Sequence, residues 1–267
     1  MAKAGRENFG VASLLLPRAT RRHLLAIYRF ARLVDDVGDE VGGDRLDLLD
    51  RLERDLERAY AGTPEHALLR RLAPTVRELE LPREPFERLI EANRQDQRVS
   101  RYETYAELEA YCELSANPVG RLVLHVLGAA TPERVDASDA VCTGLQLAEH
   151  WQDVGEDYRR GRVYLPREDM RRFGVEDEDL AAERVGEQLA RLLAFEVERA
   201  RRLLARGLPL VASLGGRARL LVAGYVSGGR AALDAIEKAG FEVLGSPPRA
   251  TKPARAAALA RVLREAT

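Results

Sequence analysis

The chain has 267 residues, of which 32% are charged, yet its formal net charge at pH 7 is only −1. A chain of this length buries a substantial core, and the balanced charge argues against a nucleic-acid partner. The two cysteines, Cys112 and Cys142, are too few for a disulfide framework and fit a reducing compartment. The first residues lack a signal-peptide pattern, and the apolar runs are far shorter than the roughly 20 residues of a membrane span. We therefore expect a soluble, cytoplasmic protein.

The composition predicts an all-α fold. Ala, Leu, Arg and Glu dominate, aromatic residues make up 6%, and no alternating strand-like runs occur. Gly and Pro divide the chain into helix-length pieces. Residues 44–62 repeat apolar side chains at helical spacing, with Asp44 as the candidate N-cap and Gly62 as the stop. Residues 184–207 show the same pattern, so we predict one all-α domain over residues 1–245.

The last residues, 246–267, form a basic segment rich in Pro and Ala. Three alternatives are open for this segment: a loosely attached tail, a packing arm, or a weak anchor to an anionic membrane surface. The loosely attached tail is the commonest outcome for a terminal segment, and we expect it here.

Two segments place aspartates four residues apart on a predicted helix. In residues 26–40 the residues that share one face are Tyr28, Arg32, Asp35 or Asp36, and Asp39. In residues 145–157 the matching stripe is Gln146, Glu149 or His150, Asp153 and Asp157. One such pair is common on a solvated helix, where it has no function. Two pairs, each beside an otherwise apolar face, favour carboxylates that project into the interior of a helical bundle.

Carboxylates without His or Cys partners favour a hard cation, and Mg²⁺ typically shares its coordination with a phosphate. Guanidinium groups, which chelate phosphate oxygens, stand close to both stripes: Arg32, Arg159, Arg160 and Arg162. A di-iron site is excluded, because no Glu-x-x-His motif occurs. The sequence therefore predicts a site for Mg²⁺ and a diphosphate.

At these residues the chain resembles the squalene/phytoene synthase family. "YRFARLVDDVGDE" resembles the first aspartate-rich motif of that family, and "LQLAEHWQDVGEDYRRGRVYLP" resembles the second. "ENFGVASLLLP", "NRQDQ" and "YCELSANPVGRLVL" resemble further segments of it. The resemblance covers nearly the whole chain. It implies a single-domain isoprenoid synthase helical bundle with a central active-site cavity.

Within the family, these motifs are most similar to the bacterial hopanoid-pathway branch. The resemblance implies that the chain ionises presqualene diphosphate and lets water capture the cation to give hydroxysqualene. It implies two or three Mg²⁺ ions bound with the diphosphate and no requirement for NADPH. It leaves open two alternatives: condensation of two farnesyl or geranylgeranyl diphosphates to presqualene diphosphate, squalene or phytoene, and a catalytically inactive assembly protein. Peripheral membrane contact and association with other squalene or hopanoid pathway enzymes are further expectations.

The resemblance also implies roles for individual residues. Asp35, Asp39, Asp153 and Asp157 would hold Mg²⁺, and Tyr28 and Arg32 would contact the phosphate. The residues implied to bind substrate are Asn8, Phe9, Gln146, Arg162 and Tyr164. One position departs from the family, which has Asn four residues before Asp153, whereas this chain has Glu149. Glu149 can still ligate Mg²⁺, but it adds negative charge to a site for a diphosphate.

Overall fold

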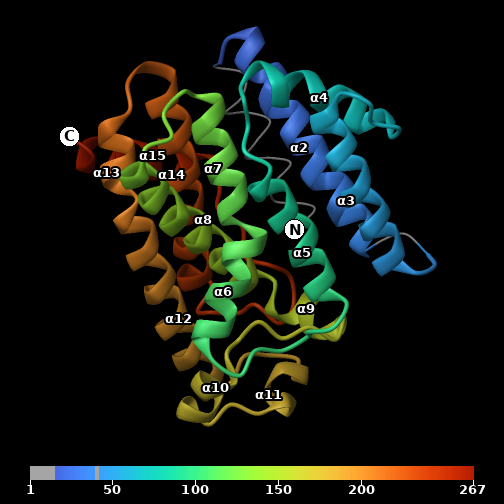
Figure 1. The fold of residues 1–267 in the computed structure, drawn as a ribbon. Helices are drawn as coiled ribbons and strands as arrows, with labels where there is room; N and C mark the ends of the chain where they lie inside the picture. The colour runs from blue at the N-terminus through green and yellow to red at the C-terminus, as the bar shows by residue number, and fades with distance from the viewer. Residues whose placement is uncertain (1–15, 40–41) are drawn as a thin grey trace. The chain divides into compact units, whose positions relative to one another are not determined.

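The computed structural model describes residues 16–39 and 42–267. Within these ranges the regular structure is helical, apart from one isolated bridge between Arg101 and Val163 (Figure 1), which confirms the all-α prediction. No helix in this part of the chain is long and apolar enough to cross a membrane. The chain forms two compact units: unit 1 comprises Met1–Val99 and Glu113–Asp139, and unit 2 comprises Ser100–Cys112 and Ala140–Thr267.

Unit 1 is built around α2, which packs against four other helices. Its helices are α2 (Arg18–Asp39), α3 (Arg45–Ala61), α4 (Ala67–Glu78), α5 (Glu84–Asp96) and α7 (Asn117–Val126). The prediction for residues 44–62 is confirmed: the Asp44 side chain accepts a hydrogen bond from Asp47 N, and Gly62 ends α3 in the left-handed conformation. The core includes Phe30 and Phe86, whose rings meet edge to face at 5.1 Å between centroids. This packing holds α2 and α5 together.

Unit 2 contains most of the remaining helices. They are α9 (Val154–Arg159), α10 (Arg167–Phe173), α11 (Asp177–Ala181), α12 (Glu187–Arg206), α13 (Leu208–Ser213), α14 (Gly216–Lys238) and α15 (Lys252–Glu265). Helices α6 (Tyr105–Ser115) and α8 (Pro132–Gln152) contribute residues to both units. Helix α12 confirms the pattern predicted for residues 184–207. It packs on α10 and α14, and α14 in turn packs on α15.

The basic C-terminal segment forms a packing arm. Thr251 caps α15 by accepting a hydrogen bond from Ala254 N, and Ala258 and Val262 are buried. The helix packs along α14, and Arg261 pairs with Asp234 on that helix at 2.8 Å. The expected loosely attached tail is therefore wrong for residues 252–265, because small apolar side chains on one face of α15 fit against α14.

The predicted helix through residues 145–157 is interrupted. Helix α8 ends at Gln152 and α9 begins at Val154. A contact with a distant segment accompanies the interruption: the Gly155 N–H donates to Val243 O at 3.4 Å rather than to its own helix. A Cβ at Gly155 would lie 2.3 Å from Leu244 O, so a glycine is required for the two segments to approach. The periodicity gave no sign of this contact, because its partner lies far along the chain.

Candidate active site

The first aspartate motif lies on α2. Tyr28, Arg32 and Asp35 are partly buried, and Asp39, the last residue of the helix, is exposed. Arg32 Nη2 pairs with Asp36 Oδ1 at 2.6 Å. The structure therefore puts this guanidinium group one helical turn before Asp36, on the helix that carries the predicted metal ligands.

Asp35 has a neutral polar partner on α5. Burial raises the pKa of the Asp35 carboxyl to about 6, and a hydrogen bond from the Asn93 side chain opposes that rise by favouring the carboxylate. Asn93 is only 7% exposed, and its Nδ2 also donates to Leu89 O at 3.1 Å. Its Oδ1 lies against Gly38, where a Cβ would come within 2.2 Å. Gly38 thus allows α2 and α5 to approach closely enough for Asn93 to reach Asp35.

The second motif keeps its carboxylates one turn apart although the helix is interrupted. Backbone hydrogen bonds run from Asp153 N to Glu149 O at 3.0 Å and from Asp157 N to Asp153 O at 2.8 Å. Burial and then the charge of Asp153 raise the pKa of Asp157 to about 7. Burial and the charge of Glu156 raise the pKa of Asp153 as well. Two partly desolvated carboxylates that repel each other favour the binding of a cation between them.

The two motifs offer carboxylate oxygens in pairs. Within residues 16–39 and 42–267, no group of three or more His, Cys, Asp or Glu side chains forms a complete metal site. Each motif instead offers a pair of oxygen ligands, Asp35 with Asp39 in unit 1 and Asp153 with Asp157 in unit 2. Mg²⁺ is commonly bound through one or two carboxylates, with waters and substrate phosphates completing the octahedron. Such pairs of oxygen ligands are chemically compatible with Mg²⁺.

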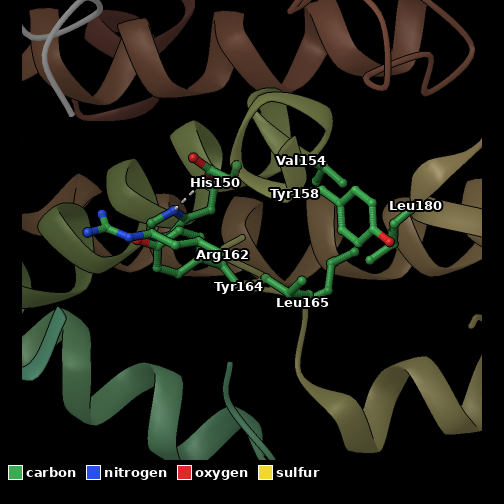
Figure 2. Close-up of a pocket in the computed structure, with 9 residues that line it drawn as sticks. His150, Val154, Tyr158, Arg162, Tyr164, Leu165 and Leu180 are labelled. Carbon is green, nitrogen blue, oxygen red and sulfur yellow. Dashed lines mark ion pairs between the residues drawn. The ribbon is translucent and has the colours of Figure 1, made fainter. Parts of the chain in front are cut away.

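His150 lies at the centre of the second motif. Its ring stacks on Tyr164 with centroids 3.6 Å apart and planes 18° apart, and Figure 2 shows the two rings together with the Arg162 side chain beside them. Its Nε2 lies 3.1 Å from Gln146 Nε2, and its Nδ1 lies 4.0 Å from Asp157 Oδ2. Burial and the charge of Arg162 lower the pKa of His150 to about 3. The ring is therefore neutral at physiological pH, and its contact with Asp157 is made by a dipole rather than a cation.

The three arginines that follow the second motif have different surroundings. Arg159 Nη1 donates to Leu244 O at 2.9 Å, and Arg160 pairs with Glu156 at 2.7 Å. Arg162 lines a small pocket in unit 2 together with His150, Val154, Asp157, Tyr158, Val163, Tyr164, Leu165 and Leu180. Of the three, Arg162 is the one whose side chain the structure places beside both Asp157 and Tyr164.

Several aromatic side chains of unit 2 have packing roles. The Arg199 guanidinium lies 4.0 Å from the centre of the Tyr105 ring. Tyr111 packs against Tyr102 and Tyr164, with ring centroids 5.5 and 6.0 Å away. Trp151 is fully buried, as a core residue should be. Asn8 and Phe9, implied to bind substrate, lie outside the described residues.

Sequence reasoning missed the polar residues that support the aspartates. His150 is an alternative to Glu149 in the carboxylate stripe, with no role assigned to it, and Asn93 is an uncharged residue at the start of the "NRQDQ" segment. The signal that could have found them is an uncharged polar residue at a position where helical periodicity predicts burial, since such a residue needs a hydrogen-bonding partner. Gly38 and Gly155, each inside an aspartate motif, could likewise have indicated a close backbone approach.

Comparison with known proteins identifies the family. Residues 2–256 match the family model for squalene/phytoene synthase. The hydroxysqualene synthase of Rhodopseudomonas palustris is 39% identical over 212 residues, which cover 78% of this chain and 71% of that protein. The 15-cis-phytoene synthase of Synechocystis is 36% identical over 209 residues, which cover 73% of this chain and 62% of that protein.

A solved structure supports the same family assignment. The crystal structure of squalene synthase HpnC from Alicyclobacillus acidocaldarius matches with a TM-score of 0.85 and 44% identity, and the match covers 90% of each chain. The fold is thus the helical fold of isoprenoid synthases. The chain belongs to the squalene/phytoene synthase family, whose members use prenyl diphosphates, and the resemblance stated from its motifs is confirmed.

Proposed function

We propose that the protein converts presqualene diphosphate to hydroxysqualene in a Mg²⁺-dependent reaction. The observation that carries the proposal is the pair of partly desolvated carboxylates in the second motif, Asp153 and Asp157, both with raised pKa values. Such a pair suits a metal-bound diphosphate rather than a solvated surface. The preference for hydroxysqualene rests on the motif similarity and on the R. palustris relative named above.

Ionisation breaks the bond between carbon and the diphosphate oxygen, and the diphosphate leaves with the bonding electron pair. Water then adds its oxygen to the rearranged cation and gives up a proton. When bound, Mg²⁺ supplies Lewis-acid stabilisation of the charge on the leaving group. The residues that would hold Mg²⁺ ions are Asp35 and Asp39 at the first motif and Glu149, Asp153 and Asp157 at the second.

The chain's own groups bind and orient the substrate. Arg162 provides a fixed positive charge beside Asp157, which favours the charge that develops on the diphosphate. Tyr164 is held by its stack on His150, and Gln146 is held by the nitrogen of the same ring. Tyr28 and Arg32 would play the corresponding part at the first motif. Because the cation must not meet water before it has rearranged, the hydrocarbon chains require a dry, apolar cavity.

A product assay tests the proposal. Purified protein with Mg²⁺ and without NADPH is given presqualene diphosphate in one reaction and farnesyl diphosphate in another, and the extracts are analysed by gas chromatography and mass spectrometry. We expect hydroxysqualene from presqualene diphosphate alone. Asp157→Asn should reduce its formation by about 100-fold or more, because the metal loses a charged ligand. Consumption of farnesyl diphosphate would instead establish a condensing enzyme.

The main alternative is condensation of two farnesyl or geranylgeranyl diphosphates, as in the phytoene synthase relative. Reduction to squalene would also consume a hydride donor, whereas the proposed reaction consumes only water. An inactive assembly protein is the second alternative, but retention of both aspartate pairs argues against it. Membrane contact through residues 246–267 and association with other pathway enzymes stay predictions. A vesicle flotation assay of the full chain tests the first of these.

A further inference from the structure

The His150 ring lies next to three side chains that the proposed function places in the active site. It lies on α8 and contacts the Gln146 amide, one turn earlier, through Nε2. It faces the Asp157 carboxylate on α9 through Nδ1. It stacks on the Tyr164 ring, which comes from the extended segment after α9. One buried ring, 6% exposed, therefore lies between groups from three consecutive segments of unit 2.

The contact with Gln146 pairs one tautomer of this ring with one orientation of the amide. In the orientation that the structure has, the Gln146 amide nitrogen lies 3.1 Å from Nε2 and donates to it when the ring proton lies on Nδ1. The opposite tautomer would turn a lone pair on Nδ1 toward the Asp157 oxygens. With the proton on Nδ1, an N–H dipole points at the carboxylate. The 4.0 Å between His150 Nδ1 and Asp157 Oδ2 is too long for a hydrogen bond. A movement of about 1 Å would bring the two atoms within hydrogen-bonding distance.

We propose that His150 is a positioning residue for the second aspartate motif. Through one ring it orients the Asp157 carboxylate toward the metal and fixes the Tyr164 and Gln146 side chains beside the substrate. The arrangement matches the way that an outer group orients a metal ligand in other proteins, where its loss lowers metal affinity about 10- to 100-fold. The inference rests on the proposed function, because it takes Asp157 as a ligand of Mg²⁺.

The test measures metal binding directly. Mn²⁺, used in place of Mg²⁺, is titrated into the full-length chain with inorganic pyrophosphate at pH 7.5, and free Mn²⁺ is followed by electron paramagnetic resonance. His150→Phe keeps the ring and its stack on Tyr164 but removes both nitrogens. We expect it to weaken Mn²⁺ binding about 10-fold while the melting temperature stays close to that of the wild type. His23→Phe is the matched control, since it removes another buried imidazole, which hydrogen-bonds Thr75 at 3.0 Å.

A second pair of variants keeps the test decisive if His150→Phe does not fold. His150→Asn retains an N–H near the position of Nδ1, whereas His150→Leu is its near isostere without polar atoms. Mn²⁺ should bind the Asn variant at least 5-fold more tightly than the Leu variant. This ratio separates a polar role from a packing role, because both variants lose the ring.

The outcomes separate the inference from the proposed function. If the wild-type protein binds Mn²⁺ and pyrophosphate and His150→Phe binds them equally well, His150 only fills space and the inference is overturned. If the wild-type protein binds neither, the metal-diphosphate site itself is wrong, and the role of His150 falls with it. Weaker binding in His150→Phe but not in His23→Phe supports the inference.

Discussion

Gly155→Ala tests the contact that interrupts the second motif. An added Cβ would lie 2.3 Å from Leu244 O and 2.6 Å from Leu244 Cα, and backbone atoms cannot rotate away as a flexible side chain can. Relief of this overlap would separate α9 from the segment around Leu244. It would break two hydrogen bonds, from Gly155 N to Val243 O and from Arg159 Nη1 to Leu244 O.

The expected loss of stability follows from these contacts. Two hydrogen bonds contribute about 2 kcal/mol, and overpacking costs about 1–3 kcal/mol more. The higher helix propensity of alanine offsets about 1 kcal/mol. The net destabilisation is about 2–4 kcal/mol, and because Asp157 lies on the displaced helix, product formation should fall as well. Urea unfolding followed by circular dichroism measures the first effect, and the product assay measures the second.

Gly186→Ala is the control for this experiment. Gly186 caps α12 in an extended conformation that any residue adopts, and nothing lies within 4 Å of an added Cβ. This variant should unfold at nearly the wild-type urea concentration. If Gly155→Ala is as stable and as active as Gly186→Ala, the close approach of Leu244 does not determine the geometry of the second motif.

Three further predictions follow from other contacts. Gly38→Ala should displace Asn93, whose Oδ1 would lie 2.2 Å from the new Cβ, and weaken Mn²⁺ binding several-fold because Asp35 loses its amide partner; unchanged binding would contradict this. Burial raises the pKa of the Glu196 carboxyl from 4.5 to about 8, so its contribution to the free energy of unfolding falls as the pH rises from 4.5 to about 8. Arg199 pairs with the Glu196 carboxylate at 2.8 Å and opposes part of this effect, so Glu196→Gln should lose less stability than the wild type between pH 4.5 and pH 9, in urea unfolding at both pH values; an equal loss in both proteins would refute it. Glu149→Asn restores the residue that the family has at this position, so it keeps an oxygen that can ligate Mg²⁺ and removes a negative charge near the diphosphate; steady-state kinetics should give a lower KM with kcat nearly kept, and a large loss of kcat would mean that the Glu149 carboxylate is an essential ligand.

The sequence predicted the helical class and the aspartate pairs because both depend on local spacing. Asp44 and Gly62 bound α3 as expected, since a cap and a left-handed stop act within one turn. The interruption after Gln152 could not be predicted, because it depends on Val243, far along the chain. The role of Asn93 could not be predicted for a similar reason: its side chain reaches Asp35 only because Gly38 lets α2 and α5 approach closely.

The C-terminal segment illustrates the same limit. Its Pro-rich, basic opening favoured a loosely attached tail, and composition alone does not reveal a partner surface. The structure supplies that partner: α15 packs on α14, with Ala258 and Val262 buried.

The measurement that tests the central claim most directly follows the oxygen of the product. Presqualene diphosphate is incubated with the protein and Mg²⁺ in ¹⁸O-labelled water without NADPH, and the product is analysed by mass spectrometry. If water captures the cation, the alcohol carries one ¹⁸O atom, and the Asp157→Asn variant forms about 100-fold less of this labelled alcohol. A hydrocarbon product, an alcohol without the label, or no turnover of presqualene diphosphate would contradict the proposed reaction.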